Sequence, residues 1–302
     1  MMKTILSLIL TLGVLVCGAA LAVRYLPSHS TLGNDNDMKS SLMRIRLGDP
    51  KGSDLGGQGS STDNHPSGMK FYQRSWERGS LGTVEFMHGK HSFTIDNVLS
   101  VLGMDDQDVP EGIYQWNINF GVSPEQADTH EAALARMMKL FSDLRARGWV
   151  RYIQSSLPRL SGQQAWNYLG VQSTYSLDPS YTSTIAEWKA ALRKMPQWIF
   201  YADGVYLKAS LMESNMGDVV GKTTYLLTIK IMSEYAFYGI GYFPGDSDKI
   251  ANWKALLPAE LQRYHAKRLM TEAALKEQGY TIDTTYQDPP IKALQESSAN
   301  PQ

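Results

Sequence analysis

The sequence has almost no cysteine. Cys17 is the only one in 302 residues, and it lies inside an apolar N-terminal segment, residues 5–23. The rest of the chain therefore has no disulfide, no thiolate metal ligand, no cysteine nucleophile and no thiol redox chemistry. The body must be stabilised by its hydrophobic core alone, which is feasible for a chain of this length. Hydrophobic residues, at 43%, are numerous enough to form such a core.

The chain also lacks an excess of charge of either sign. Its 29 Lys and Arg residues nearly balance its 30 Asp and Glu residues, and the formal net charge is −1. The basic residues are scattered along the chain, so the electrostatic signature of a nucleic-acid-binding surface is missing. We therefore expect no nucleic-acid partner.

Sequence motifs for nucleotide binding, hydrolysis and metal binding are incomplete. Residues 217–223, GDVVGKT, are one residue too short for a phosphate-binding loop, and a β-rich segment follows them instead of a helix. The nucleophile motif G-x-S-x-G and the zinc motif H-E-x-x-H do not occur. The turn containing His88 and His91 and the acidic loop 105–108 lack the ligand number and spacing of zinc and calcium sites. We expect no nucleotide, no metal and no cofactor.

The most informative feature that is present is an uninterrupted run of apolar or small residues at 5–23, between Lys3 and Arg24. A positive residue, an apolar block and the A-x-A triplet at 20–22 are the parts of a secretory signal peptide. The run is also just long enough to span a bilayer. Residues 1–24 are therefore predicted to be a signal peptide or a membrane anchor. With either alternative we expect a periplasmic protein, soluble or tethered to the inner membrane by residues 5–23.

Composition separates this segment from the body of the protein. Residues 25–69 are rich in Gly, Ser, Asp and Asn, which is typical of a flexible linker, and residues 42–47, LMRIRL, are its one apolar stretch. The ordered body can be divided into two similar-sized halves, 70–160 and 161–294. A disordered tail is expected at 295–302.

The first half has the pattern of a β-α-β unit. Residues 83–95 indicate two strands joined by a turn, followed by a short helix at 96–102 and a strand at 113–120. The quartet SPEQ at 123–126 is typical of a helix start. Apolar residues at helical spacing then continue to Gly148, which precedes a further strand.

Turn and cap residues define the second half. Thr184 and Glu187 are predicted to form a capping box that opens a short helix. The dipeptide Asp203-Gly204 predicts a two-residue hairpin, because type I′ turns need positive φ at both positions. Residues 223–243 are β-rich, so three consecutive antiparallel strands are expected.

Helices return near the C-terminus, where segments 249–256 and 258–278 are expected to be helical and Gly279 to end the second. The order of strands and helices fits antiparallel sheets better than a doubly wound sheet. The sequence therefore predicts an α+β fold with helices packed on one face of the sheet or sheets.

Tyrosine and tryptophan together outnumber phenylalanine, with 16 Tyr and 7 Trp against 8 Phe. These two residue types combine an apolar ring with a polar group and are favoured at half-wet interfaces. The aromatic candidates for a binding surface are Trp166, Tyr168, Tyr175, Tyr181 and Tyr242.

These features favour a bacterial envelope protein that acts by binding another protein, either an envelope protein or one delivered from outside. An immunity or inhibitor protein and an accessory of a secretion machine both fit. The inner membrane is a second partner if residues 5–23 are retained. The alternative is an extracytoplasmic hydrolase without a recognisable motif, for which His88, His91, His130 and Asp178 are the first candidates.

Overall fold

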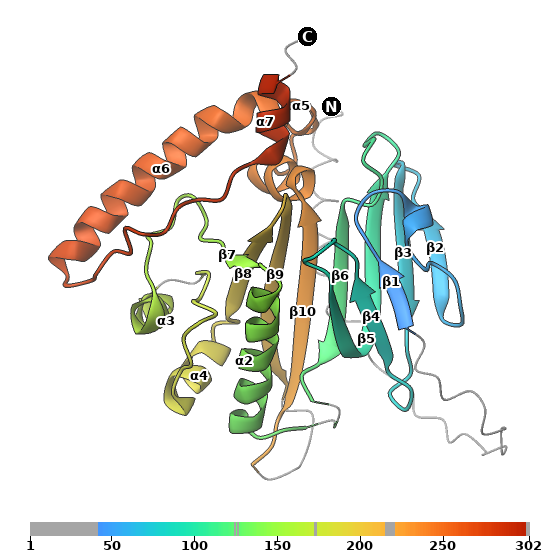
Figure 1. The fold of residues 1–302 in the computed structure, drawn as a ribbon, viewed down its shortest axis with the longest axis horizontal. Coiled ribbons are helices and arrows are strands. Elements are labelled where there is room, and N and C mark those ends of the chain that lie inside the picture. The colour runs from blue at the N-terminus through green and yellow to red at the C-terminus, as the bar shows by residue number, and fades with distance from the viewer. Residues whose placement is uncertain (1–41, 124, 126, 172–173, 215–220, 300–302) are drawn as a thin grey trace, which may run out of the picture.

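Ten strands form one sheet in the part of the chain that the computed structural model describes, residues 42–123, 125, 127–171, 174–214 and 221–299. The strands are β1 Leu42–Ile45, β2 Ser60–Asn64, β3 Met69–Ser75, β4 Gly82–Phe86, β5 Phe93–Asp106, β6 Gln115–Gly121, β7 Val150–Arg151, β8 Gln197–Ala202, β9 Val205–Ser214 and β10 Thr224–Ser233. Their order is β1-β4-β5-β6-β10-β9-β8-β7, and β3 and β2 extend the sheet beside the second half of β5 (Figure 1). The β1–β4 pair is parallel and the other pairs are antiparallel, so the α+β class and the mostly antiparallel sheet are confirmed.

Helices lie against both faces of this sheet. They are η2 Pro50–Gly52, α2 His130–Ala146, α3 Gly162–Val171, α4 Ile185–Leu192, η3 Tyr235–Ile240, α5 Ser247–Ala251, α6 Trp253–Glu277 and α7 Lys292–Ala299. In Figure 1, α2 crosses in front of strands β8 to β10, with α4 beside it. Helices α2, α3 and α4 share the larger hydrophobic core with the sheet.

The predicted hairpin is confirmed. Asp203 and Gly204 have φ angles of 49° and 84°, and β8 and β9 pair from Ala202 opposite Val205 outward. Because strand side chains alternate between faces, the core-facing residues of β10 recur every second position from Tyr225 to Ile231. The capping box of α4 is also present, with Thr184 and Glu187 bonding each other's backbone N–H groups.

Helix α2 begins later than the sequence indicates. The predicted start at 123–126 is wrong: Ser123 accepts a hydrogen bond from the N–H of Glu125 in a local turn, and the N-cap is Thr129, whose hydroxyl accepts from Ala132 N. The helix ends where expected, since Gly148 has a φ of 83°.

The expectation that helices cover one face is too narrow. In β8, Trp198 and Phe200 face the larger core, whereas Ile199 and Tyr201 face a second hydrophobic cluster on the opposite side. This second cluster contains side chains of η3, α5, α6 and α7, which therefore cover one end of the other face.

Part of the predicted linker is ordered sheet. Residues 42–69 contain β1, β2 and the start of β3, which corrects the expectation of a flexible segment there. Met43 and Ile45 are buried beside the core residues of β4, so even the short apolar stretch is enough to anchor this edge. Strand β2 is polar and exposed, so it is held in the sheet by backbone hydrogen bonds to β3. Residues 1–41, which include the predicted signal or anchor, lie outside the described residues.

Three further expectations need correction. Residues 96–102 belong to the long strand β5 and form no helix. Pro258 lies inside α6, which runs unbroken from Trp253, so the predicted break before Pro258 is wrong, and residues 249–251 belong to the separate helix α5. The predicted disordered tail is helical through Ala299 in α7. The strand predicted after Gly148 is present but short, because β7 has two residues.

The two predicted halves share one sheet. Seven register pairs join β6 of the first half to β10 of the second, and the larger core includes residues from Met43 to Ile282. Among the helices of the described residues, none combines the length and the hydrophobicity that a membrane span requires.

Candidate functional site

Three of the five aromatic candidates are core residues. Trp166, Tyr168 and Tyr175 are 6%, 6% and 0% exposed, so the expectation that they lie on a contact surface is wrong. The Tyr175 hydroxyl donates to the Pro158 carbonyl at 2.6 Å, which satisfies its polar atom inside the core. The helical spacing of Ala165, Trp166 and Leu169 in α3 is the sequence signal for this burial.

The other two aromatic candidates are half-buried and their hydroxyls are engaged. Tyr181 bonds the Glu187 carboxylate of the α4 capping box at 3.2 and 3.3 Å. Tyr242 bonds Ser155 at 3.2 Å and lines a groove of about 370 Å³ between the segment that follows η3 and α6. Burial raises the pKa of Tyr242, so its hydroxyl stays protonated at neutral pH. A role of Tyr181 or Tyr242 in binding stays a prediction.

The residues proposed for a hydrolase occupy three separate places. His88 and His91 are neighbours, with ring centroids 5.5 Å apart. His130 begins α2 and is hydrogen-bonded to the Tyr225 hydroxyl. Asp178 accepts hydrogen bonds from Gly162 N and from the backbone and hydroxyl of Ser180, a local structural role. Within the described residues these side chains form no histidine, carboxylate and hydroxyl constellation.

The histidine pair is held by backbone carbonyls. His88 Nε2 donates to the Ala202 carbonyl at 3.0 Å, and His91 Nδ1 donates to the Arg147 carbonyl at 2.6 Å. Both rings pack against Trp149. Burial lowers the pKa of His88, which favours the neutral ring. The pair therefore joins the turn after β4 to β8 and to the end of α2. Among the described residues, no group of three or more potential ligands for a metal ion is present.

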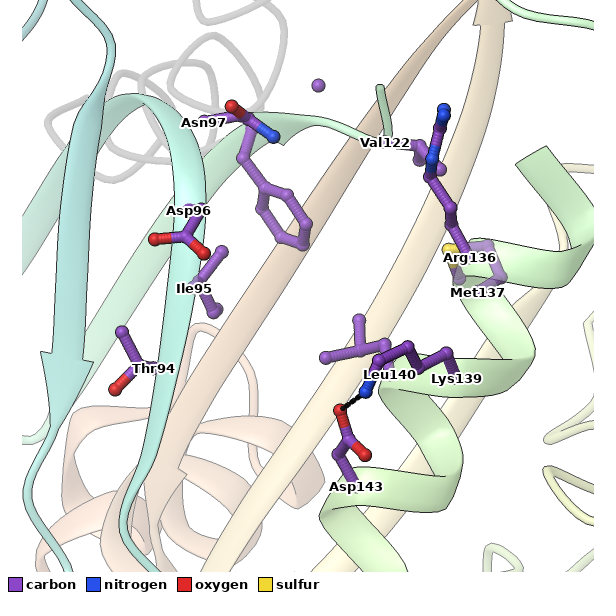
Figure 2. A pocket seen from close by; sticks show the side chains of 12 residues that line it. Thr94, Ile95, Asp96, Asn97, Val122, Arg136, Met137, Lys139, Leu140 and Asp143 are labelled. Atoms are coloured by element: carbon purple, nitrogen blue, oxygen red, sulfur yellow. Dashed lines mark hydrogen bonds and ion pairs between the residues drawn. The ribbon is translucent and has the colours of Figure 1, made fainter. Parts of the chain in front are cut away.

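A groove of about 190 Å³ separates the bend of β5 from α2 (Figure 2). Asp96 lies on the strand wall, and Arg136, Lys139 and Asp143 lie on the helix wall. Lys139 Nζ contacts Asp143 at 2.7 Å, and Arg136 forms an ion pair with Asp128. Asp96 accepts a hydrogen bond from the hydroxyl of Thr83 in β4 at 2.9 Å. Because both cations of the groove are already paired with carboxylates, it offers no strong contact to an anionic ligand.

Helix α6 turns charged side chains toward the body of the protein. Arg268 is 5% exposed and donates to the Leu157 carbonyl at 2.9 Å and to the carbonyls of residues 153 and 154 at 3.1 and 3.0 Å. The same guanidinium bonds both carboxylate oxygens of Asp288, at 2.7 and 3.1 Å. One side chain thus joins α6 to the loop after β7 and to the segment that follows α6.

A second ion pair lies one turn further along α6. Glu272, 3% exposed, accepts from Arg159 N and Nε at 2.9 Å and from Arg159 Nη2 at 2.8 Å. Burial alone would raise the pKa of Glu272, but the hydrogen bonds and charge of Arg159 outweigh it and lower the pKa. We call the four side chains Arg159, Arg268, Glu272 and Asp288 the clamp.

The outward face of α6 is apolar. Leu269 and Met270 are 61% and 76% exposed, although they lie between the buried charges of Arg268 and Glu272. Exposed alanines continue this face at helical spacings of three and four residues, interrupted by Gln262. In Figure 1, α6 is the long orange helix at the outer edge of the molecule. We call this surface the apolar ridge; it consists of Ala255, Ala259, Ala266, Leu269, Met270 and Ala273.

The ridge was not among the candidates from the sequence. A helical projection of residues 253–277 places Leu269 and Met270 away from Trp253, Leu257 and Leu275, and this signal was available.

No protein-family model, curated protein or solved structure matches this chain.

Proposed function

We propose that this is an exported protein of the bacterial envelope that acts by binding another protein through the apolar ridge of α6. The observation that carries the proposal is the inverted polarity of residues 268–272 of the helix. Its charged residues Arg268 and Glu272 are buried, whereas Leu269 and Met270 between them are exposed. Helices of globular proteins ordinarily have the opposite arrangement, and contiguous exposed apolar surface marks interaction sites.

The clamp makes the ridge suitable for binding. Arg268 and Glu272 hold the helix by directed hydrogen bonds to the loop after β7, so the apolar side chains are presented on a fixed element. A preorganised helix loses little conformational entropy when a partner covers it. The export of the protein rests on the apolar segment 5–23. Within this class, neutralisation of a protein delivered into the periplasm and assistance to a secretion machine are the two roles we favour.

The test compares three versions of the full chain in affinity purification from the envelope fraction. The wild type should recover one stoichiometric partner. The double variant Leu269→Glu/Met270→Glu should lose it, because burial of each side chain contributes roughly 1.5–3 kcal/mol. Loss of both corresponds to an affinity weakened by about 100-fold or more.

The matched control is Lys267→Glu, which also lowers the net charge by two but lies beside the ridge on an exposed position of α6. It should retain the partner. Repeated recovery of the wild-type protein alone, or equal recovery by the double variant, would refute the proposal.

A further inference from the structure

Two lysines lie directly opposite each other on the sheet face away from α2. Lys208 of β9 and Lys230 of β10 are register partners, and both point to the face opposite the core residues Leu207 and Ile229. Both are half-buried. Side chains at such paired positions have Cβ atoms about 5 Å apart, close enough for the charge of Lys230 to act on Lys208.

This pairing is unfavourable in the isolated protein. Like charges directly opposite each other on a sheet are destabilising. Burial lowers the pKa of both lysines, and the charge of Lys230 lowers that of Lys208 further, while no carboxylate contributes. Among the described residues neither lysine forms an ion pair or a hydrogen bond. An arrangement that costs stability and lacks compensation is typical of a functional site.

The next strand adds a third donor. Asn117 of β6 is the register partner of Lys230, and its Oδ1 accepts a hydrogen bond from Gln115 Nε2 at 3.1 Å. The side chain of Asn117 lies on the same sheet face as the lysines, and its amide nitrogen, which takes no part in that bond, is a further donor on this face. The three adjacent strands present two ammonium groups and one amide donor, and an anion complements all three.

A row of polar side chains continues this surface. Thr228 of β10 donates to Asn119 Oδ1 at 2.7 Å, and Asn119 Nδ2 donates to Ser100 Oγ of β5 at 3.1 Å. These three residues are register partners across adjacent strands, so their hydrogen bonds fix a polar platform beside the lysines. A surface that extends over several strands suits a macromolecule better than a small ion.

We propose that Lys208, Lys230 and Asn117 form a second contact site, which binds carboxylates of an acidic segment of a protein partner. The inference rests on the proposed function, since the ligand belongs to a protein, but it involves a different surface of opposite chemistry. A protein segment fits because it can supply several carboxylates along the polar platform. The overall charge of −1 means that attraction of an acidic partner must come from such a local site.

The test measures binding of a fluorescein-labelled ten-residue oligoglutamate to the full chain by fluorescence anisotropy. The variant Lys208→Gln/Lys230→Gln should raise the Kd at least tenfold. The control Lys51→Gln/Lys189→Gln removes the same charge from two exposed lysines elsewhere and should change the Kd less than twofold. The single variants Lys208→Gln and Lys230→Gln should each have an intermediate effect.

Thermal unfolding provides a second measurement that does not depend on the probe. Because the substitutions remove a repulsion, the double variant should melt at the same temperature as the wild type or higher. Equal weakening by the site and control variants would overturn the proposal. Binding of inorganic phosphate or of phosphatidylglycerol vesicles to the two lysines as tightly as oligoglutamate would also overturn it, because the site would then not be specific to a protein.

Failure of this inference can be distinguished from failure of the proposed function. If affinity purification recovers a partner that depends on Leu269 and Met270 but oligoglutamate does not distinguish the lysine variants, the second site alone is refuted. If no partner is recovered, the proposed function fails whatever the oligoglutamate result.

Discussion

Replacing Arg268 with alanine should destabilise the protein by about 4 kcal/mol. The guanidinium is buried, bonds the carbonyls of residues 153, 154 and 157, and pairs with Asp288. Removal leaves these acceptors without their donor in a largely water-free site. Removing the buried partner from such a network costs roughly 3–5 kcal/mol, since the buried carbonyls and the Asp288 carboxylate lose their donor. For a domain of this size the melting temperature should fall by about 10 °C.

The assay is thermal and urea unfolding followed by circular dichroism, with hydrogen exchange to locate the change. Exchange should accelerate first in α6 and in the segment around Asp288, because the clamp holds those two elements together. Arg268→Lys should be intermediate, since an ammonium keeps the charge but cannot reach acceptors on several sides. Arg263→Ala removes an exposed arginine of the same helix and should change stability little. A loss below about 1 kcal/mol for Arg268→Ala would refute the reasoning.

Two further predictions concern other parts of the fold. Burial lowers the pKa of His88 below its ordinary value of 6.5, so the unfolded state binds more protons in mildly acidic solution. The contribution of His88 to stability should therefore be full above pH 6.5 and decline as the pH falls through its folded pKa. The variant His88→Gln should flatten this part of the pH profile of the unfolding free energy in urea. An unchanged slope would show that His88 is not the group responsible. Glu234 accepts hydrogen bonds from Lys292 N and Ala293 N at 2.8 and 2.7 Å and so caps α7. Glu234→Ala should destabilise the protein by about 1–2 kcal/mol and expose α7 to protease, whereas undiminished protease resistance would show that α7 is held otherwise.

The features predicted correctly from the sequence depend on neighbouring residues. The turn at Asp203-Gly204 and the capping box of Thr184 and Glu187 each need a particular conformation or hydrogen bond within a few positions. Their chemistry allows little else, so tertiary contacts did not override them.

The errors arose where distant contacts decide the structure. Asn97 adopts a φ of 60°, close to where the pairing of β5 with both neighbours shifts register. Such an irregularity interrupts the alternation of apolar and polar residues that identifies a strand, so the short apolar run at 96–102 predicts a helix instead. Three of the five aromatic candidates are buried, because composition indicates that tyrosine and tryptophan suit an interface but not which of them reach the surface.

The burial of charged residues of α6 also could not be read from the local pattern, although the helical projection places Leu269 and Met270 on the outer face. Glu272 is buried only because Arg159 meets it from 113 residues away, and Arg268 is buried among carbonyls more than 110 residues away. The apolar residues between them are exposed as a consequence. The opposition of Lys208 and Lys230 likewise follows from the register of β9 and β10.

The pairing of β6 with β10 has a consequence for the folding of the protein during its synthesis. Asn119 and Thr228, which face each other across this pair, are 109 residues apart in sequence. At the usual elongation rate of about 5–20 residues per second, the edge of β6 waits on the order of 5–20 s for its neighbour to be synthesised. We expect the chain to stay incompletely folded throughout this interval, when an open strand edge is vulnerable to aggregation. The export proposed above would require an unfolded chain, and the late synthesis of β10 would prolong the unfolded state.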